Sequence, residues 1–316
     1  MKDGMTAPKY RLPTVIIPYP GPCKESVCHD VFVYLRPETN GVEVESTIMR
    51  TIRSSEQYRK RAALVYLANI PGDFISQKRI VEEHYRLQLY FATHGKEAFT
   101  ESMKCRFAEY FGEDFEKAVV CGAFEAMREL DMTYDELFRL YVPDSDLMHI
   151  NGQSVKRYKG LYIVNYDIPA ILHKNNIRTD IAVMTFRTDF HYETIHRMVD
   201  DMAGALIDSG TLHPGKALSR VFHYSKGPFD QIRDAIGYLY SKDGRHEPLK
   251  GIAFARFLID RGLKMHQILG LTRNPLCTFA VGGGTEEADI FTYTADDTFE
   301  GAYSKCERIR SQFLLV

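Results

Sequence analysis

Hydrophobic residues follow two alternating periods along most of the chain, and this alternation predicts strands followed by helices. Asp30–Arg36 is a short run of β-branched and aromatic residues, which is typical of a buried strand. After Pro37, the apolar residues Val44, Ile48 and Ile52 recur at the spacing of one helix face. We therefore expect an α/β fold with a mixed sheet built from strand–helix units.

The same alternation continues toward the end of the sequence. Further strands are expected at Ala63–Ala68, Leu161–Asn165, Asp180–Arg187, Arg220–Tyr224, Leu276–Val281 and Asp289–Thr294. A helical insertion is expected at about residues 77–142, with Val119 among the apolar positions of its helices. The last residues predict a closing C-terminal helix, because Phe299, Cys306 and Phe313 fall on one apolar face.

Local signals mark several turns and helix starts. Asn151-Gly152 predicts the tight turn of a hairpin, since both residue types tolerate a left-handed backbone. Gly282-Gly283-Gly284 lies between two expected strands, so we interpret it as a hairpin loop rather than a phosphate-binding loop. Thr133 and Glu136 have the spacing of a capping box, and Pro228 fits the first position of a helix.

Three of the expected strands begin with aspartate. They start at Asp30, Asp180 and Asp289, and the first two carry Arg36 and Arg187 near their ends. One hypothesis is an old duplication of a β–α unit. The alternative is chance, because a short strand signature carries little information. The sequence leaves both open.

Residues 1–29 form a proline-rich N-terminal arm. The prolines disfavour a helix or a central strand there; they are Pro8, Pro13, Pro18, Pro20 and Pro22. Residues 30–316 are expected to form the α/β body, either as one domain or as two intimate halves, 30–150 and 151–316. Because Val15-Ile16-Ile17 is apolar, the arm is a candidate for self-association or for contact with a protein partner.

The amino-acid composition limits which kinds of binding partner and which cellular compartment are expected. The 40 basic and 42 acidic residues leave a net charge of −2, which argues against a nucleic-acid partner. No apolar run approaches the ~20 residues needed to cross a bilayer, so no membrane partner is expected. Six cysteines in 316 residues are too few for a disulfide scaffold and fit the reducing cytoplasm. We therefore expect a cytoplasmic protein.

Residues suited to anion binding occur at the expected strand ends. In open α/β sheets, ligands bind where strands lead into helices, and Arg36 and Arg187 occupy such positions. If their strands are parallel neighbours, the two guanidinium groups converge on a carboxylate or a phosphate. Ser225 and Lys226 precede a helix, whose first backbone N–H groups favour an anion. For each of these residues, a purely structural role is the alternative.

One segment holds the candidate catalytic residues. Asp189 and His191 follow an expected strand and offer a carboxylate and an imidazole for acid–base chemistry. His196 and Asp200 lie four residues apart on one helix face, which is a spacing that two metal ligands can use. Because no third ligand accompanies them, no metal is predicted, and the sequence identifies no cofactor.

The favoured hypothesis is a protein that binds a small anionic ligand, with or without catalysis. P-loop, dinucleotide-binding, nucleophile-elbow and kinase signatures are absent from the sequence, which therefore does not decide whether the protein is an enzyme. The alternative is a non-catalytic interaction protein or a homo-oligomeric assembly protein. A metal-dependent hydrolase built on His196 and Asp200 is the least favoured hypothesis.

Overall fold

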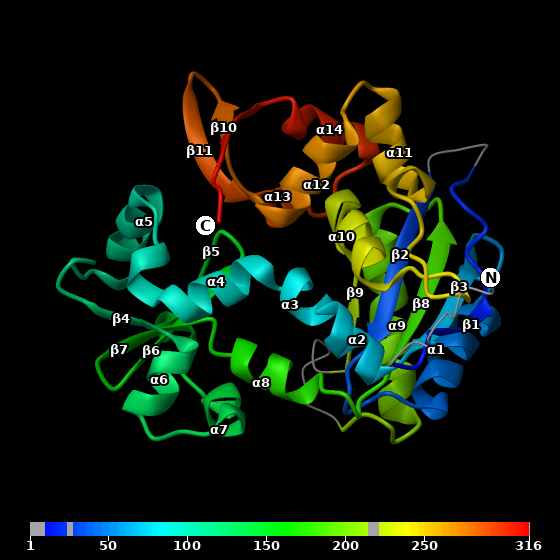
Figure 1. Cartoon of the computed structure of the whole chain (residues 1–316), viewed down its shortest axis with the longest axis horizontal. Helices are drawn as coiled ribbons and strands as arrows, with labels where there is room; N and C mark the ends of the chain where they lie inside the picture. Colours follow the sequence, from blue (N-terminus) through cyan, green and yellow to red (C-terminus); the bar gives the residue numbers. More distant parts are fainter. Residues whose placement is uncertain (1–9, 24–27, 214–220, 316) are drawn as a thin grey trace, which may run out of the picture. The chain divides into compact units, whose positions relative to one another are not determined.

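The computed structural model describes residues 10–23, 28–213 and 221–315, and these residues divide into two units (Figure 1). Unit 1 contains the described residues of Met1–Val81 and Asn175–Arg261. Unit 2 contains those of Glu82–Lys174 and Gly262–Val316. Each unit is thus assembled from two separate stretches of sequence, whereas the halves expected from the sequence, 30–150 and 151–316, are continuous.

Unit 1 is built around one sheet. Its strands are β1 (Thr14–Ile17), β2 (His29–Leu35), β3 (Ala62–Ile70), β8 (Ile181–Thr188) and β9 (Phe222–Tyr224). Its helices are α1 (Val42–Ser54), α2 (Gly72–Lys78), α9 (Tyr192–Asp208), α10 (Pro228–Tyr238) and α11 (Ala253–Asp260). Helix α3 (Ile80–His84) contains the first boundary between the units.

The topology of this sheet is that of two interlocked β–α–β segments. The strand order is β1-β3-β8-β2-β9, and every neighbouring pair is antiparallel. The segments β2–α1–β3 and β8–α9–β9 each join two parallel strands, with one strand of the other segment between them. This is the split β–α–β arrangement of ferredoxin-like folds. Asp30 and Asp180 stand near the start of equivalent strands, as the duplication hypothesis requires.

Strand β2 lies at the centre of the unit 1 core, and all of its residues are buried. Val31 and Val33 belong to a core cluster with residues of α1 and α9. On the opposite face, Tyr34 packs on Tyr238 of α10, with the ring centroids 4.5 Å apart. Because helices cover both faces, the strand reads as a continuous apolar run rather than an alternating one.

Unit 2 contains two sheets. Its strands are β4 (Val119–Gly122), β5 (Leu147–Ile150), β6 (Gln153–Tyr158), β7 (Leu161–Val164), β10 (Leu276–Val281), β11 (Gly284–Asp289) and β12 (Ile309–Gln312). Its helices are α4 (Arg86–His94), α5 (Glu101–Phe111), α6 (Ala123–Glu129), α7 (Tyr134–Arg139), α8 (Ile168–Lys174), α12 (Met265–Arg273), α13 (Ile290–Tyr293) and α14 (Phe299–Cys306). The sheet β4-β7-β6-β5 is mixed, because β4 and β7 are parallel, and the sheet β11-β10-β12 is antiparallel.

The structure confirms the α/β class and the helix-rich insertion, but it corrects one assignment within the insertion. Val119 was expected on a helix face, and it instead begins strand β4, which also contains Cys121. The β-branched pair Val119-Val120 favours an extended backbone, and pairing with β7 provides the hydrogen bonds.

Two assignments near the C-terminus also change. Asp289–Thr294 was expected as a strand, but Ile290–Tyr293 is helical, because the Asp289 side chain accepts a hydrogen bond from the Phe291 N–H and caps the helix. The closing helix begins at Phe299 as expected and ends at Cys306. It is followed by strand β12, which pairs with β10 although its residues continue the helical period.

The local turn and cap signals are confirmed. Asn151 and Gly152 have φ angles of 47° and 75° between β5 and β6, and the two-residue turn at Gly282 and Gly283 joins β10 to β11 in the same way. Thr133 forms the capping box of α7, and helix α10 begins with a proline.

The described part of the N-terminal arm contributes a strand to unit 1. Strand β1 pairs with β3, and Pro13 and Pro18 flank it. Residues 1–9 and 24–27 of the expected arm lie outside the described residues, as does Arg220 at the start of the expected strand Arg220–Tyr224. None of the helices that the structure describes has the length and the apolar character needed to cross a membrane.

Candidate functional site

Arg187, an expected anion-binding residue, is bound to a buried aspartate. Its Nε donates to Asp30 Oδ1 at 2.7 Å, and its Nη2 donates to Asp30 Oδ2 at 3.0 Å and to the Gly21 carbonyl at 2.7 Å. The Tyr19 hydroxyl also donates to Asp30. The guanidinium group is therefore held between the sheet and the N-terminal arm, and its charge is balanced by Asp30.

Arg36 does not converge with Arg187. Strands β2 and β8 are antiparallel, and Asp30 is the register partner of Arg187. Arg36 lies six residues further along, so the two backbone positions are about 20 Å apart. The expected convergence required parallel neighbours, and the antiparallel pairing places the arginines at opposite ends of β2. The Arg36 guanidinium lies 5.7 Å from the centre of the Tyr34 ring.

Ser225 and Lys226 stand before helix α10, as expected, but an aspartate of the helix itself occupies the site expected for an anion. The Lys226 N–H donates to Asp230 Oδ2 at 3.1 Å. The Ser225 hydroxyl is buried and donates to Asp234 Oδ2 at 2.6 Å. Burial raises the pKa of Asp230, while Arg233 lowers it and is paired with it at 2.6 Å. These contacts tie β9 to α10.

His223 contacts the same group of residues as Ser225, and the sequence analysis did not identify it as a candidate. Its Nε2 lies 3.3 Å from Asp234 Oδ2, the oxygen that Ser225 also contacts. Burial holds the pKa of His223 well below its usual value, and Asp230 opposes this shift while Arg36 and Lys226 add to it. The imidazole is therefore neutral at pH 7. No sequence spacing announced it, because its contacts come from α10 and β2.

The two expected catalytic residues, Asp189 and His191, have different surroundings. Asp189 forms an exposed ion pair with Arg61 at 2.8 Å, and the hydrogen bond from Arg61 lowers the pKa of that carboxyl. His191 is the exposed residue that precedes helix α9, and no side-chain capping bond is present there. Asp189 is thus engaged with a cation at the surface.

His196 and Asp200 share one face of α9, and the described residues complete no three-ligand group around them. The Tyr224 hydroxyl lies 2.9 Å from His196 Nδ1, and Asp200 is exposed. Within the described ranges, no third histidine, cysteine or acidic side chain joins these two within 4.8 Å. The pair therefore offers only two ligands.

His29 is a second buried imidazole of unit 1. Gln231 Nε2 donates to His29 Nδ1 at 3.0 Å and also lies 2.8 Å from the Tyr192 hydroxyl. Burial, and to a smaller extent His191, lowers the pKa of His29 to about 4. The fold therefore holds this side chain in its neutral form.

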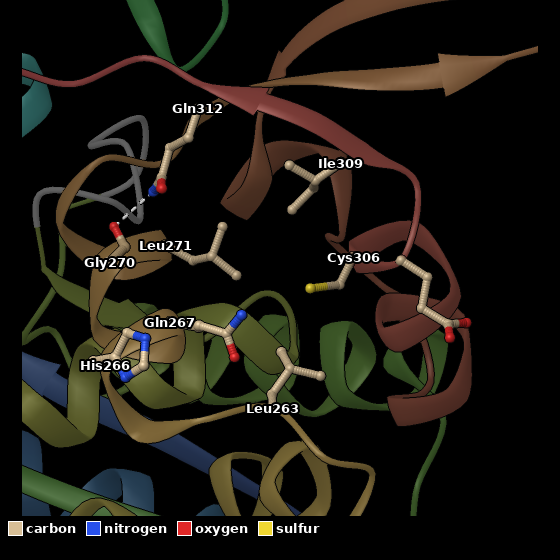
Figure 2. Close-up of a pocket in the computed structure, with 9 residues that line it drawn as sticks. Leu263, His266, Gln267, Gly270, Leu271, Cys306, Ile309 and Gln312 are labelled. Atoms are coloured by element: carbon tan, nitrogen blue, oxygen red, sulfur yellow. Dashed lines mark hydrogen bonds between the residues drawn. The ribbon is translucent and has the colours of Figure 1, made fainter.

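Unit 2 contains a pocket of about 450 Å³ (Figure 2). It lies between α12, the end of α14 and strand β12. Figure 2 shows Leu271, Ile309 and Cys306 directed toward a common space. The lining residues are Leu263, His266, Gln267, Gly270, Leu271, Cys306, Glu307, Ile309 and Gln312.

A glycine and a glutamine shape this pocket. A Cβ at Gly270 would meet only the Gln312 Oε1, at 3.9 Å, so the missing side chain contributes open space. Gln312 Nε2 donates to the carbonyls of Gly270 and Asn274, both at 2.7 Å. These bonds satisfy carbonyls at the C-terminal end of α12 and hold β12 beside the helix.

The pocket offers apolar walls and a few polar groups. Leu263, Leu271 and Ile309 are apolar, and His266 and Gln267 can hydrogen-bond. Burial, with a smaller contribution from Glu307, raises the pKa of Cys306 to about 11. The thiol therefore stays protonated at neutral pH and is a poor nucleophile.

The sequence did not reveal this pocket. Cys306 was noted only as part of an apolar helix face, and Gly270 and Gln312 carry no motif. Their stretches of sequence are brought together by the pairing of β12 with β10 and by the hydrogen bonds of Gln312 to Gly270 and Asn274. Only the folded chain therefore brings them to one site.

Known proteins offer no relative for comparison, because no protein-family model, curated protein or solved structure matches this chain. The fold and the pocket define the class instead. The chain is an α/β protein with a ferredoxin-like unit and a second unit that carries a pocket of small-molecule size.

Proposed function

We propose that this protein binds a small, largely apolar molecule in the pocket of unit 2, without catalysing a reaction on it. The observation that carries the proposal is the pocket itself, whose volume of about 450 Å³ lies in the range of known small-molecule sites. Apolar walls with a few hydrogen-bonding groups are typical of such sites, because burial of the ligand supplies affinity and the polar groups orient it.

The chemistry of the lining favours binding over catalysis. Cys306 is the one thiol among the lining residues, and its pKa of about 11 keeps it protonated. A protonated thiol packs as a small apolar group. Cys306 is therefore assigned to the wall of the site.

This proposal keeps the small-molecule part of the sequence hypothesis and moves the site. Arg187 and Ser225 are engaged by Asp30 and Asp234 within unit 1, which disfavours a strand-end anion site built on them. We also propose a cytoplasmic location. Its support is that six cysteines in 316 residues are too few for the disulfide scaffold of a secreted domain.

A pair of substitutions at Gly270 tests the pocket. Gly270→Leu fills it, because a side chain at this position enters open space, whereas Gly270→Ala adds one methyl group. Apolar fragments are first identified by NMR chemical-shift changes of the wild-type backbone near residue 270. We expect Gly270→Leu to weaken their binding by at least about tenfold, and Gly270→Ala to change it by less than about threefold.

Both variants should keep the far-ultraviolet circular dichroism of the wild type, which separates loss of binding from loss of fold. If Gly270→Leu binds the same fragments equally well, the pocket is not the site. Native mass spectrometry of gently purified protein provides an independent test. A retained small molecule that is absent from Gly270→Leu supports the proposal, whereas a ligand-free homo-oligomer favours the assembly alternative.

A further inference from the structure

Two glutamine amides that line the pocket have orientations fixed by backbone contacts. The Gln267 Oε1 accepts a hydrogen bond from the Lys264 N–H at 2.8 Å. The Gln312 Nε2 donates to the carbonyls of Gly270 and Asn274, both at 2.7 Å. Only the oxygen of an amide can accept from an N–H group, and only its nitrogen can donate to a carbonyl. Neither amide can therefore turn over without losing these bonds.

The fixed orientations leave one donor and one acceptor for a ligand. The Gln267 Nε2 forms no hydrogen bond with any described residue, and Figure 2 shows it on the side of the amide nearer to Leu271 and Cys306. The Gln312 Oε1 accepts no hydrogen bond within the part of the chain that the structure describes, and it borders the open space at Gly270. The pocket thus presents the N–H groups of one amide and the oxygen of another.

The donor and the acceptor lie about one helical turn apart. Gln267 and Gly270 are three residues apart on α12, which separates them by ~4.5 Å along the helix axis. The Gln312 oxygen lies beside Gly270. Leu271 and Ile309 are directed toward the space that these groups border. No lysine or arginine is among the described lining residues, so the lining provides no such cation for an anionic ligand.

We propose that the pocket prefers neutral ring compounds that carry a carbonyl group at one end and a hydroxyl group at the other. The carbonyl accepts from the Gln267 Nε2, and the hydroxyl donates to the Gln312 Oε1. The ring packs against Leu271 and Ile309, which removes apolar surface from water. This inference rests on the proposed function, because it names the ligand class of the same pocket. It replaces the anionic ligand expected from the sequence with a neutral one.

Three probes of similar size separate the two hydrogen bonds. 4′-Hydroxyacetophenone carries both groups, 4-isopropylphenol has a methyl-bearing carbon in place of the carbonyl, and 4′-methylacetophenone has a methyl group in place of the hydroxyl. Binding to the full chain is followed by NMR titration of the backbone signals near residue 270. Because Gln267 is exposed and its hydrogen bonds compete with water, we expect 4′-hydroxyacetophenone to bind only about threefold more tightly than either of the others.

Gln267→Glu isolates the donor. Its carboxylate can still accept from the Lys264 N–H, so the start of α12 keeps this contact, while the amide N–H groups are lost. The preference for 4′-hydroxyacetophenone over 4-isopropylphenol should therefore disappear, whereas its preference over 4′-methylacetophenone should remain. Gln77→Glu makes the same substitution at an exposed residue of unit 1 and should retain both preferences. Both variants should keep the circular dichroism of the wild type.

The outcomes separate this inference from the proposed function. If the three probes bind near residue 270 with equal affinity, or if Gln267→Glu keeps both preferences, the pocket remains a small-molecule site and the assigned ligand class is wrong. Intermolecular nuclear Overhauser effects give a second measurement on the wild type. Contact of the acetyl methyl group with the Gln267 side chain supports the inference, and its contact with Gly270 instead overturns it. Failure of every probe to bind near residue 270 overturns both proposals.

Discussion

The Asp30–Arg187 and Asp189–Arg61 pairs of unit 1 have the same chemistry and similar geometry, with N–O distances of 2.7 and 2.8 Å. They differ in burial. The side chains of Asp30 and Arg187 are 1% and 15% exposed, whereas those of Asp189 and Arg61 are 49% and 54% exposed. Water screens the charges of the exposed Asp189–Arg61 pair, whereas the buried Asp30–Arg187 pair has lost most of its hydration. Removal of one partner is therefore costly only in the buried pair.

This contrast predicts different costs for the two substitutions. Arg187→Met leaves Asp30 buried without its guanidinium partner, and we expect it to lower the free energy of unfolding by about 3 kcal/mol. Asp189→Asn breaks an exposed pair and should cost no more than about 0.5 kcal/mol. Urea unfolding followed by circular dichroism measures both. Equal costs would contradict the assignment of Arg187 to a structural role.

His29 predicts a dependence of stability on pH. Its pKa is about 4 in the fold, against a usual value of 6.5, so the unfolded chain binds more protons between these values. The contribution of His29 to the free energy of unfolding is therefore fully present above pH 6.5 and declines as the pH falls toward 4. For this group, the expected loss between pH 7.5 and pH 5 is about 2 kcal/mol.

His29→Gln should reduce this decline, measured by urea unfolding at pH 7.5 and pH 5. Part of the decline should remain, because burial also lowers the pKa of His223. The variant is compared with itself at the two pH values, which removes any constant cost of the lost contact with Gln231. A decline as steep as that of the wild type would show that His29 does not titrate as inferred.

At the scale of elements, two hairpin turns of unit 2 have nearly the same backbone but different surroundings. Gly152 and Gly160 have φ angles of 75° and 78°. A Cβ at residue 152 would overlap the Asp289 carboxylate, which is buried and caps α13, whereas a Cβ at residue 160 would meet no atom within 4 Å. An alanine at position 160 would therefore introduce backbone strain alone, whereas an alanine at position 152 would introduce backbone strain and a steric clash.

We expect Gly160→Ala to lower the free energy of unfolding by about 1 kcal/mol, which is the cost of a left-handed backbone for alanine. Gly152→Ala should cost about 3 kcal/mol, since the Asp289 cap must also move. Thermal and urea unfolding of the two variants test this. Similar costs would mean that Asp289 moves freely and that its cap contributes little.

For the whole molecule, each unit contains apolar clusters built from its own residues. One cluster lies within unit 1 and two others lie within unit 2, and the chain passes between the units at Val81, Lys174 and Arg261. Gly72 lies against the backbone of Asn176 and Thr179, so the two stretches of unit 1 approach each other near the insertion. Unit 1 therefore has the contacts needed for independent folding.

We predict that unit 1 folds alone when residues 82–174 are replaced by a flexible linker of about eight residues and the chain ends at Arg261. The expected result is a dispersed NMR spectrum and one cooperative unfolding transition. A state that binds hydrophobic dyes and lacks fixed side-chain signals would contradict this. The intact chain serves as the reference for both measurements.

Much of the local structure followed from the sequence, and the candidate site did not. The strand before Pro37, the helix bearing Val44 and Ile48, and the turn at Asn151-Gly152 all formed as expected. Predictions were wrong where a distant partner decided the outcome, as for β4 and β12. The expected convergence of Arg36 and Arg187 was wrong because it required parallel strands, and the hydrophobic period does not determine strand direction.

The sequence by itself determined the α/β class, most strand and helix positions, and the tight turns, because these depend on residue spacing and on backbone preferences within a few residues. Only the tertiary structure decided the antiparallel order of the unit 1 sheet, the separation of Arg36 from Arg187, and the pocket beside Gly270. Each of these depends on which segments pack together across long stretches of sequence. The packing that forms is the one in which the contacts of the whole folded chain have the lowest free energy.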